Sequence, residues 1–165
     1  MNKAYLCLGG NLGNCAQTFA RAIDLLAQNN ASIISKSSIY VSPAWGMENA
    51  PDFYNQVIHI GTDLGAVKLM ELLLELEKAL GRERNTNEGY ASRTIDIDIL
   101  FYNDAVIHGR FLDIPHPRLH LRRFVLEPLN EIAAELIHPA LKKSVSQLLE
   151  ECPDTGLVKK FTHAI

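Results

Sequence analysis

The chain has 165 residues and a formal net charge of −3, with 47% apolar and 21% charged residues. This composition is ordinary for a globular protein and excludes disorder as a description of the whole chain. It also excludes a membrane-spanning helix, since no run of 18 apolar residues exists. We therefore expect one domain over residues 1–165, with a core of its own.

Cysteine usage and net charge limit the compartment and the partners. Cys7, Cys15 and Cys152 are odd in number and lack the paired spacing of structural zinc sites, which argues against a disulfide framework. The apolar run at the start is too short for a signal peptide. We therefore expect a cytoplasmic protein. The slightly acidic balance argues against a nucleic-acid partner, and we expect neither a membrane partner nor oligomerisation.

Apolar periodicity and turn residues predict an alternation of strands and helices. In chain order, we expect a strand over 4–8, a helix over 15–28, a strand over 33–41, a long loop over 42–52, a strand over 53–60, a helix over 65–80, a second long loop over 82–93, strands over 94–101 and 105–108, and helices over 121–133 and 144–151. The β-α-β-β-α-β order of the first hundred residues predicts an α+β fold. We expect a ferredoxin-like βαββαβ sandwich with an antiparallel sheet and extra C-terminal helices.

Two aspartates stand in the middle of the clearest strand, which reads Thr-Ile-Asp-Ile-Asp-Ile-Leu-Phe. Alternate strand residues share a face and lie about 6.5 Å apart, so Asp96 and Asp98 point the same way. The apolar residues expected on the opposite face, toward the core, are Ile95, Ile97, Ile99 and Phe101. A carboxylate pair suits Mg²⁺, which typically binds one or two carboxylates together with substrate phosphates. The alternative is an exposed strand face, although Asp is unfavourable in strands.

Arginine is concentrated in one part of the chain. Seven of the eight arginines fall between residues 82 and 123, where no lysine occurs. A guanidinium group suits phosphate oxygens, so this window indicates oxyanion recognition. The alternative is chance clustering with surface ion pairs. One group, Arg82, Arg84 and Arg93, brackets the loop before the aspartate strand.

A second basic group begins within a rigid Pro-His-Pro turn and consists of His116, Arg118, His120, Arg122 and Arg123. Basic side chains near the start of a helix oppose the helix dipole, and a bound anion would relieve this conflict. The alternative is a helix start with exposed basic side chains.

Near the first loop and beyond this basic group lie Trp45, Phe53, Asn55 and Phe124. A flat heterocycle could stack on such rings while the amide binds its edge, although ordinary core packing explains any single ring. The segment Gly9-Gly10-Asn11-Leu12-Gly13 lacks the full phosphate-loop patterns and is interpreted as a turn.

These motifs together resemble the 6-hydroxymethyl-7,8-dihydropterin pyrophosphokinase family, essentially from end to end. The resemblance depends on segments 8–13 (Leu-Gly-Gly-Asn-Leu-Gly), 51–55 (Pro-Asp-Phe-Tyr-Asn), 81–84 (Gly-Arg-Glu-Arg), 93–100 (Arg-Thr-Ile-Asp-Ile-Asp-Ile-Leu) and 115–119 (Pro-His-Pro-Arg-Leu). It implies the same sandwich fold. It also implies transfer of diphosphate from ATP, the co-substrate, to the hydroxymethyl group of the dihydropterin, with release of AMP and with two Mg²⁺ ions.

The resemblance also implies roles for individual residues. The implied metal ligands are Asp96 and Asp98. The implied catalytic residues are these two aspartates with Arg82 and Arg93. The implied ATP-binding residues are Glu77, Arg84, Arg93, Ile99, His116 and Arg122. The implied pterin-binding residues are Ser42, Pro43, Trp45, Phe53, Asn55 and Phe124, with the ring between the two phenylalanines.

Some positions depart from the family pattern, and two other functions compete with this one. Tyr90, Ala91 and Ser92 replace a Trp and a Gly-Pro that are common in the second loop, and Trp45 stands where a smaller residue is usual. A non-catalytic ferredoxin-like module for RNA or a nucleotide would need aromatic strands and a basic balance. A degenerate relative that binds ATP and transfers nothing is compatible with the sequence.

Overall fold

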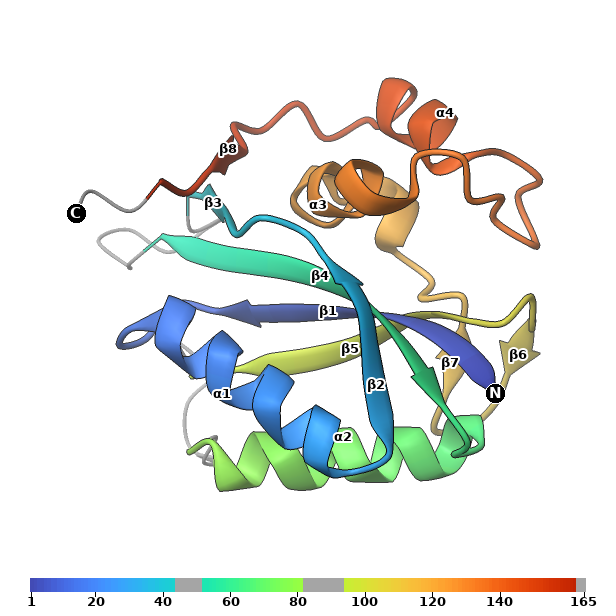
Figure 1. Cartoon of the computed structure of the whole chain (residues 1–165). Helices are drawn as coiled ribbons and strands as arrows, with labels where there is room; N and C mark the ends of the chain where they lie inside the picture. Colours follow the sequence, from blue (N-terminus) through green and yellow to red (C-terminus); the bar gives the residue numbers. More distant parts are fainter. Residues whose placement is uncertain (44–51, 82–93, 163–165) are drawn as a thin grey trace.

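The fold is an antiparallel sheet with helices on both faces (Figure 1), as given by a computed structural model that describes residues 1–43, 52–81 and 94–162. The strands are β1 (Asn2–Gly10), β2 (Ala31–Lys36), β3 (Tyr40–Ser42), β4 (Phe53–Thr62), β5 (Asp96–Tyr102), β6 (Ile107–His108), β7 (Asp113–Ile114) and β8 (Lys159–Lys160). The helices are α1 (Cys15–Gln28), α2 (Ala66–Ala79), α3 (Arg123–Ala133) and α4 (Val145–Glu150), with a 3₁₀ turn at Leu119–Leu121.

The main sheet has the order β5-β1-β4-β3-β8, and β2 pairs with β4 beside β3. Every pairing in it is antiparallel. Strand β5, which carries the two aspartates, therefore lies at one edge. The α+β class, the antiparallel sheet and the additional C-terminal helices are confirmed. The expected helix over 15–28 is confirmed in full, while β7 and β8 were not expected.

Two apolar clusters lie on the two faces of the sheet. The larger packs α1 and α2 against it, through residues such as Phe19, Leu26, Leu69 and Ile58. Figure 1 shows α1 and α2 together on this face and α3 and α4 on the other. The smaller cluster, which includes Cys7, Val57, Leu100, Leu126 and Leu129, joins α3 to the second face. A sheet covered on both faces needs apolar residues at successive strand positions, which explains the buried run Leu6-Cys7-Leu8.

Helix α1 follows its sequence signals closely. The Asn14 side chain accepts a hydrogen bond from the backbone N–H of Gln17 at 3.1 Å and so caps the first turn. Phe19, Ala22 and Leu26 recur at helical spacing and are fully buried. In the segment that the sequence indicated as a turn, Gly9 and Gly10 belong instead to β1, and residues 11–14 connect this strand to α1.

The strand expected over 33–41 is two strands, because Ser37 interrupts the ladder. Its hydroxyl oxygen accepts a hydrogen bond from the backbone N–H of Val57 at 3.0 Å, and the amide of Gln56 donates to its carbonyl at 2.8 Å. Side-chain bonds of this kind compete with regular strand pairing. Strand β3 then starts again at Tyr40, in register with Asn55.

The expectation that Phe101 shares a face with Ile95, Ile97 and Ile99 is wrong. The pairing of β1 with β5 shifts register between Tyr5 and Leu6. A bulge of this kind offsets the alternation of side chains by one residue. Phe101 therefore joins the cluster under α3, whereas Ile97 and Ile99 pack under α1 and α2.

Within the described residues, no helix is long and apolar enough to cross a membrane.

Candidate active site

Asp96 and Asp98 lie on the α3 face of edge strand β5. Asp98 pairs in register with Cys7, and Asp96 pairs with Gly9. Directly opposed residues of antiparallel strands point to the same face, and Cys7 belongs to the cluster under α3. Asp96 is half-buried and Asp98 is exposed. The two carboxylates therefore stand side by side along the strand, as the alternation of side chains predicts.

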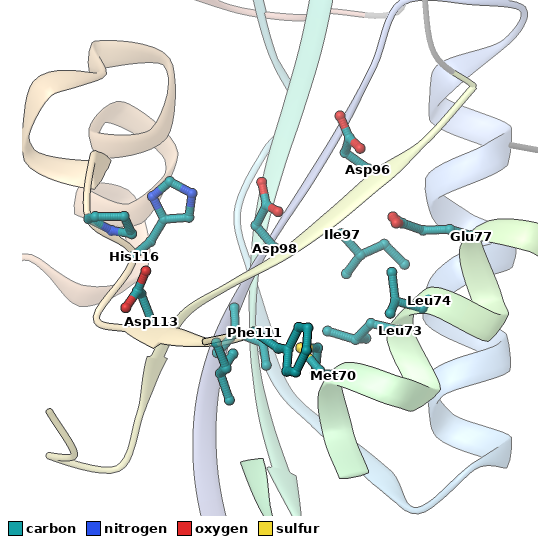
Figure 2. Close-up of a pocket in the computed structure, with 13 residues that line it drawn as sticks. Met70, Leu73, Leu74, Glu77, Asp96, Ile97, Asp98, Phe111, Asp113 and His116 are labelled. Carbon is teal, nitrogen blue, oxygen red and sulfur yellow. The ribbon is translucent and has the colours of Figure 1, made fainter. Parts of the chain in front are cut away.

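A pocket of about 340 Å³ opens beside this strand. Helix α2, strand β5 and the segment around residues 111–117 form its walls. The lining residues that also appear among the sequence-predicted site are Glu77, Asp96, Asp98, Ile99 and His116. In Figure 2, Asp98 lies between His116 and Asp96, and Glu77 approaches from α2 on the other side. Acidic and imidazole groups from three separate chain segments thus meet at one opening.

Glu77 and Ile99 approach the pocket from the opposite face of the sheet. Glu77 is only 4% exposed although it is charged, on a helix that otherwise buries leucines there. Ile99 packs into the core under α1 and α2 and also lines the pocket. The pocket consequently runs around the edge of β5, where no further strand of the described chain pairs.

His116 is anchored to the aspartate strand. Its backbone N–H donates to the carbonyl of Leu100 at 3.0 Å. Its Nδ1 accepts a hydrogen bond from the backbone N–H of Arg118 at 3.1 Å, which leaves the proton of the neutral ring on Nε2. Burial lowers the pKa of His116 below its usual value of 6.5, and the Asp98 carboxylate opposes that shift. A neutral imidazole with an Nε2–H donor suits a phosphate oxygen.

The second basic group divides into two parts. The guanidinium of Arg122 lies 5.7 Å from the ring centre of Phe124, a cation–π contact at the start of α3. Arg123 instead binds structural partners: its Nε donates to the Asp154 carbonyl at 2.8 Å and its Nη1 to Glu127 at 3.0 Å. These contacts give Arg123 a structural role at the start of α3, and its place in a phosphate cluster stays a prediction. The Nδ1 atom of His120 is buried without a hydrogen-bond partner.

The expected pterin-binding residues of β3 and β4 share the α3 face. Ser42 pairs with Phe53 in register, and Asn55 shares its side of β4 with Val57, a member of the cluster under α3. Phe124 packs against the same cluster from the first turn of α3. Pro43 is exposed at the end of β3. Ser42, Phe53 and Asn55 thus share one face of adjacent strands, and Phe124 of α3 packs against the apolar cluster on that face.

Asn55 is a buried amide at the centre of this face. It is 8% exposed, and its Nδ2 lies 3.5 Å from the Leu8 carbonyl and 3.8 Å from the Cys7 sulfur. Burial, together with the nearby Asp98 carboxylate, raises the pKa of the Cys7 thiol to about 12. Cys7 is therefore a protonated, packed side chain between the amide and the aspartates.

Four expected site residues, Trp45, Arg82, Arg84 and Arg93, lie outside the described residues. The structure adds others that the sequence did not indicate. Gly9 and Cys7 form the floor between β4 and β5, and only the strand register could place them there. Phe111 and Asp113 line the pocket from a segment without clear periodicity.

This grouping of carboxylates, imidazole, amide and aromatic rings suits a protein that binds a phosphate-bearing ligand beside a flat ring. The family model of 7,8-dihydro-6-hydroxymethylpterin-pyrophosphokinase (HPPK) matches residues 5–134. The chain belongs to this family, as the motifs of its sequence indicate.

Named relatives agree with this assignment. A 2-amino-4-hydroxy-6-hydroxymethyldihydropteridine pyrophosphokinase from Haemophilus influenzae is 35% identical over 160 residues, which cover 96% of this chain and 98% of the relative. The enzyme of the same name from Aquifex aeolicus is 38% identical over 151 residues, 92% of each chain.

A crystal structure of Plasmodium falciparum HPPK-DHPS with pteroate superimposes with a TM-score of 0.74. Its sequence is 17% identical, so this likeness shows the fold alone. The match covers 91% of this chain but only 44% of the Plasmodium chain, which is much longer.

Proposed function

We propose that this chain transfers the diphosphate of ATP to the hydroxymethyl group of 6-hydroxymethyl-7,8-dihydropterin, giving AMP and the pterin diphosphate in folate biosynthesis. Membership of the family supports this reaction. Within the molecule, the reaction is supported by one row of paired residues that crosses three neighbouring strands. Asp96 on β5, Gly9 on β1 and Asn55 on β4 are in register, so a carboxylate for phosphate chemistry faces the same side as an amide for the pterin edge.

We assign Asp96 and Asp98 as the ligands of Mg²⁺, with two ions expected. The donor set fits this metal, because carboxylate oxygens are the hard ligands that Mg²⁺ prefers. In the described part of the chain, no group of three or more His, Cys, Asp or Glu side chains could hold a metal ion by itself. Two aspartates thus suit an ion whose remaining ligands come from phosphates and water. When bound, Mg²⁺ would neutralise phosphate charge and favour in-line attack.

The nucleotide is assigned to the pocket around β5. His116 would donate its Nε2–H to a phosphate oxygen, and Arg122 would bind phosphate beside it. Glu77 and Ile99 line the same pocket. We assign Arg82 and Arg93 to the charge that develops on the transferred group and on the leaving AMP, and Arg84 to ATP. The roles of these three arginines are proposed from the family resemblance.

The pterin is assigned to the face between β3, β4 and α3. Its ring would stack between Phe53 and Phe124, and Asn55 would bind its edge through paired hydrogen bonds. Ser42, Pro43 and Trp45 would complete this side. Diphosphate transfer requires little covalent chemistry from the protein, so these residues act by holding the hydroxymethyl group near the phosphorus that it attacks.

The proposal also includes the fold arrangement, the domain, the oligomeric state and the location of the protein. The sheet order β5-β1-β4-β3 with α1 and α2 on one face supports a ferredoxin-like arrangement. A single domain over residues 1–165, a monomeric state, a cytoplasmic location and the absence of nucleic-acid or membrane partners stay predictions.

The reaction is tested by its nucleotide product. Purified protein is mixed with MgATP and 6-hydroxymethyl-7,8-dihydropterin, and the nucleotides are separated over time. We expect AMP to appear in step with the pterin diphosphate. ADP would instead indicate an ordinary kinase, and nucleotide binding without turnover would indicate a degenerate relative. Omission of the pterin is the control, since AMP formed without it would come from hydrolysis.

A further inference from the structure

Gly9 occupies the middle of the row that joins the two halves of the site. It pairs with Asp96 on one side and with Asn55 on the other. Because neighbouring strands lie about 4.8 Å apart, the row from Asp96 to Asn55 spans about 10 Å. A side chain at position 9 would stand on the same face, directly between the carboxylate and the amide.

The space above Gly9 is filled by the amide of Asn55. A Cβ at position 9 would lie 2.8 Å from Asn55 Nδ2, closer than real Cβ contacts come. The next nearest atoms, Asn55 Cγ and the Tyr54 carbonyl oxygen, would both be 3.9 Å away, which is ordinary contact. The conflict therefore involves one atom group, the amide assigned to the pterin.

The backbone does not require glycine at this position. Among the described glycines, only Gly13 and Gly81 have positive φ. Gly9 lies within a regular strand, where glycine is unfavourable compared with alanine because it packs nothing and loses more entropy. A glycine that costs stability and is not needed for a turn indicates that the missing side chain itself matters.

We propose that Gly9 is a positioning residue for the pterin, because its missing side chain leaves on β1 the space that the Asn55 amide occupies. The inference rests on the proposed function. Any side chain at position 9 displaces the amide from the orientation in which it can bind the pterin edge. Asn55 does not line the pocket around β5 and α2 to which the nucleotide is assigned.

The direct test is Gly9→Ala, assayed by steady-state kinetics with each substrate varied in turn. Loss of well-placed amide hydrogen bonds predicts a rise of about tenfold or more in KM for the pterin. We expect KM for ATP to stay within about twofold of the wild type and kcat within about threefold. An unchanged KM for the pterin, or an equal rise in both KM values, would overturn the proposal.

A matched control is available on the neighbouring strand. Gly61 also lies within a strand of the main sheet, and a Cβ there would meet the end of the Met1 side chain. Met1 is 76% exposed at the terminus, so its side chain can move aside. Gly61→Ala should therefore keep the wild-type KM for both substrates. A comparable loss of pterin affinity in this variant would mean that any strand glycine has the effect.

A double-mutant cycle isolates the contact between the two residues. In the Asn55→Ala background the amide is gone, so Gly9→Ala should change KM for the pterin by less than about twofold. The same fold-change in both backgrounds would contradict the steric link. If Gly9→Ala alone does not fold, recovery of folding in the double variant supports the link, and failure of both overturns it. Wild-type AMP formation is measured alongside, because its absence refutes the proposed reaction rather than the role of Gly9.

Discussion

The carboxylate of Asp154 accepts a hydrogen bond from the backbone N–H of Arg123 at 3.1 Å, although 31 residues separate the two. Helix α3 begins at Arg123, and its own N-cap residue, Arg122, makes no capping hydrogen bond with its side chain. The C-terminal segment therefore supplies the negative charge that this helix start lacks. Basic side chains at the start of α3 thus have an internal counterpart, besides any bound anion.

Asp154→Ala should lower the free energy of unfolding by about 1–2 kcal/mol, the usual cost of losing a helix cap. Urea denaturation followed by circular dichroism measures this difference. Asp154→Asn is the matched control, because Asn caps nearly as well as Asp. Equal stability of the alanine variant and the wild type would mean that the carboxylate contributes nothing to α3.

Asp96→Asn and Asp98→Asn should each reduce turnover at least about 10²-fold, because each replaces a proposed Mg²⁺ ligand by a neutral amide. Thermal unfolding without magnesium should be little changed, since these side chains are not in the core. AMP formation at several Mg²⁺ concentrations measures the effect. Asp104→Asn, an exposed turn residue beyond the same strand, is the control. Wild-type rates in either site variant would refute the metal assignment.

Asn55→Ala should weaken binding of the pterin and leave binding of ATP unchanged, because the amide faces β1 and α3 rather than the pocket around β5. Isothermal titration with each ligand separately measures this difference. A parallel loss of both affinities would show that Asn55 supports the structure of the whole site instead of binding the pterin.

Arg93→Ala should lower kcat at least about 10²-fold if the guanidinium stabilises charge that forms only in the transition state. Single-turnover rates at saturating ATP and pterin give this value. A raised KM with unchanged kcat would instead assign Arg93 to ground-state binding.

His138 should make the fold sensitive to mild acid. Its Nδ1 accepts hydrogen bonds from the backbone N–H groups of Ala140 and Leu141, at 3.1 and 3.0 Å. Burial lowers its pKa below the usual 6.5, and the charge of His120 lowers it further. The unfolded chain therefore binds this proton more readily than the folded chain. The stability contributed by neutral His138 is full above pH 6.5 and is lost as the pH falls through the folded-state pKa.

His138→Asn should remove this dependence, because the amide oxygen can accept the same N–H groups without titrating. Urea midpoints of both proteins between pH 7.5 and 5 measure the difference. The wild type should lose about 1.4 kcal/mol more for each unit by which folding lowers the pKa. His59 and His116 are present in both proteins, so they cancel. An equal loss of stability in both proteins between pH 7.5 and 5 would contradict the role of His138.

Local signals in the sequence predicted most of the elements. Helix α1 was predicted with its correct bounds, because its apolar residues repeat at helical spacing; the structure adds the cap at Asn14. The alternation around Asp96 and Asp98 likewise predicted a shared face. The break in the strand at Ser37 and the bulge that turns Phe101 to the other face were not predictable. Both depend on which strand lies alongside.

The sequence by itself determined the family, the alternating elements and the residue types available for phosphate and pterin chemistry, because motifs and periodicity are local properties of the chain. Only the tertiary structure decided that Arg123 pairs with Asp154 and Glu127, that Glu77 of helix α2 lines the same pocket as the two aspartates, and that Gly9 lies between Asp96 and Asn55. Those relationships depend on strand order and register, and long-range pairing between strands has no marker in the residues of one strand alone.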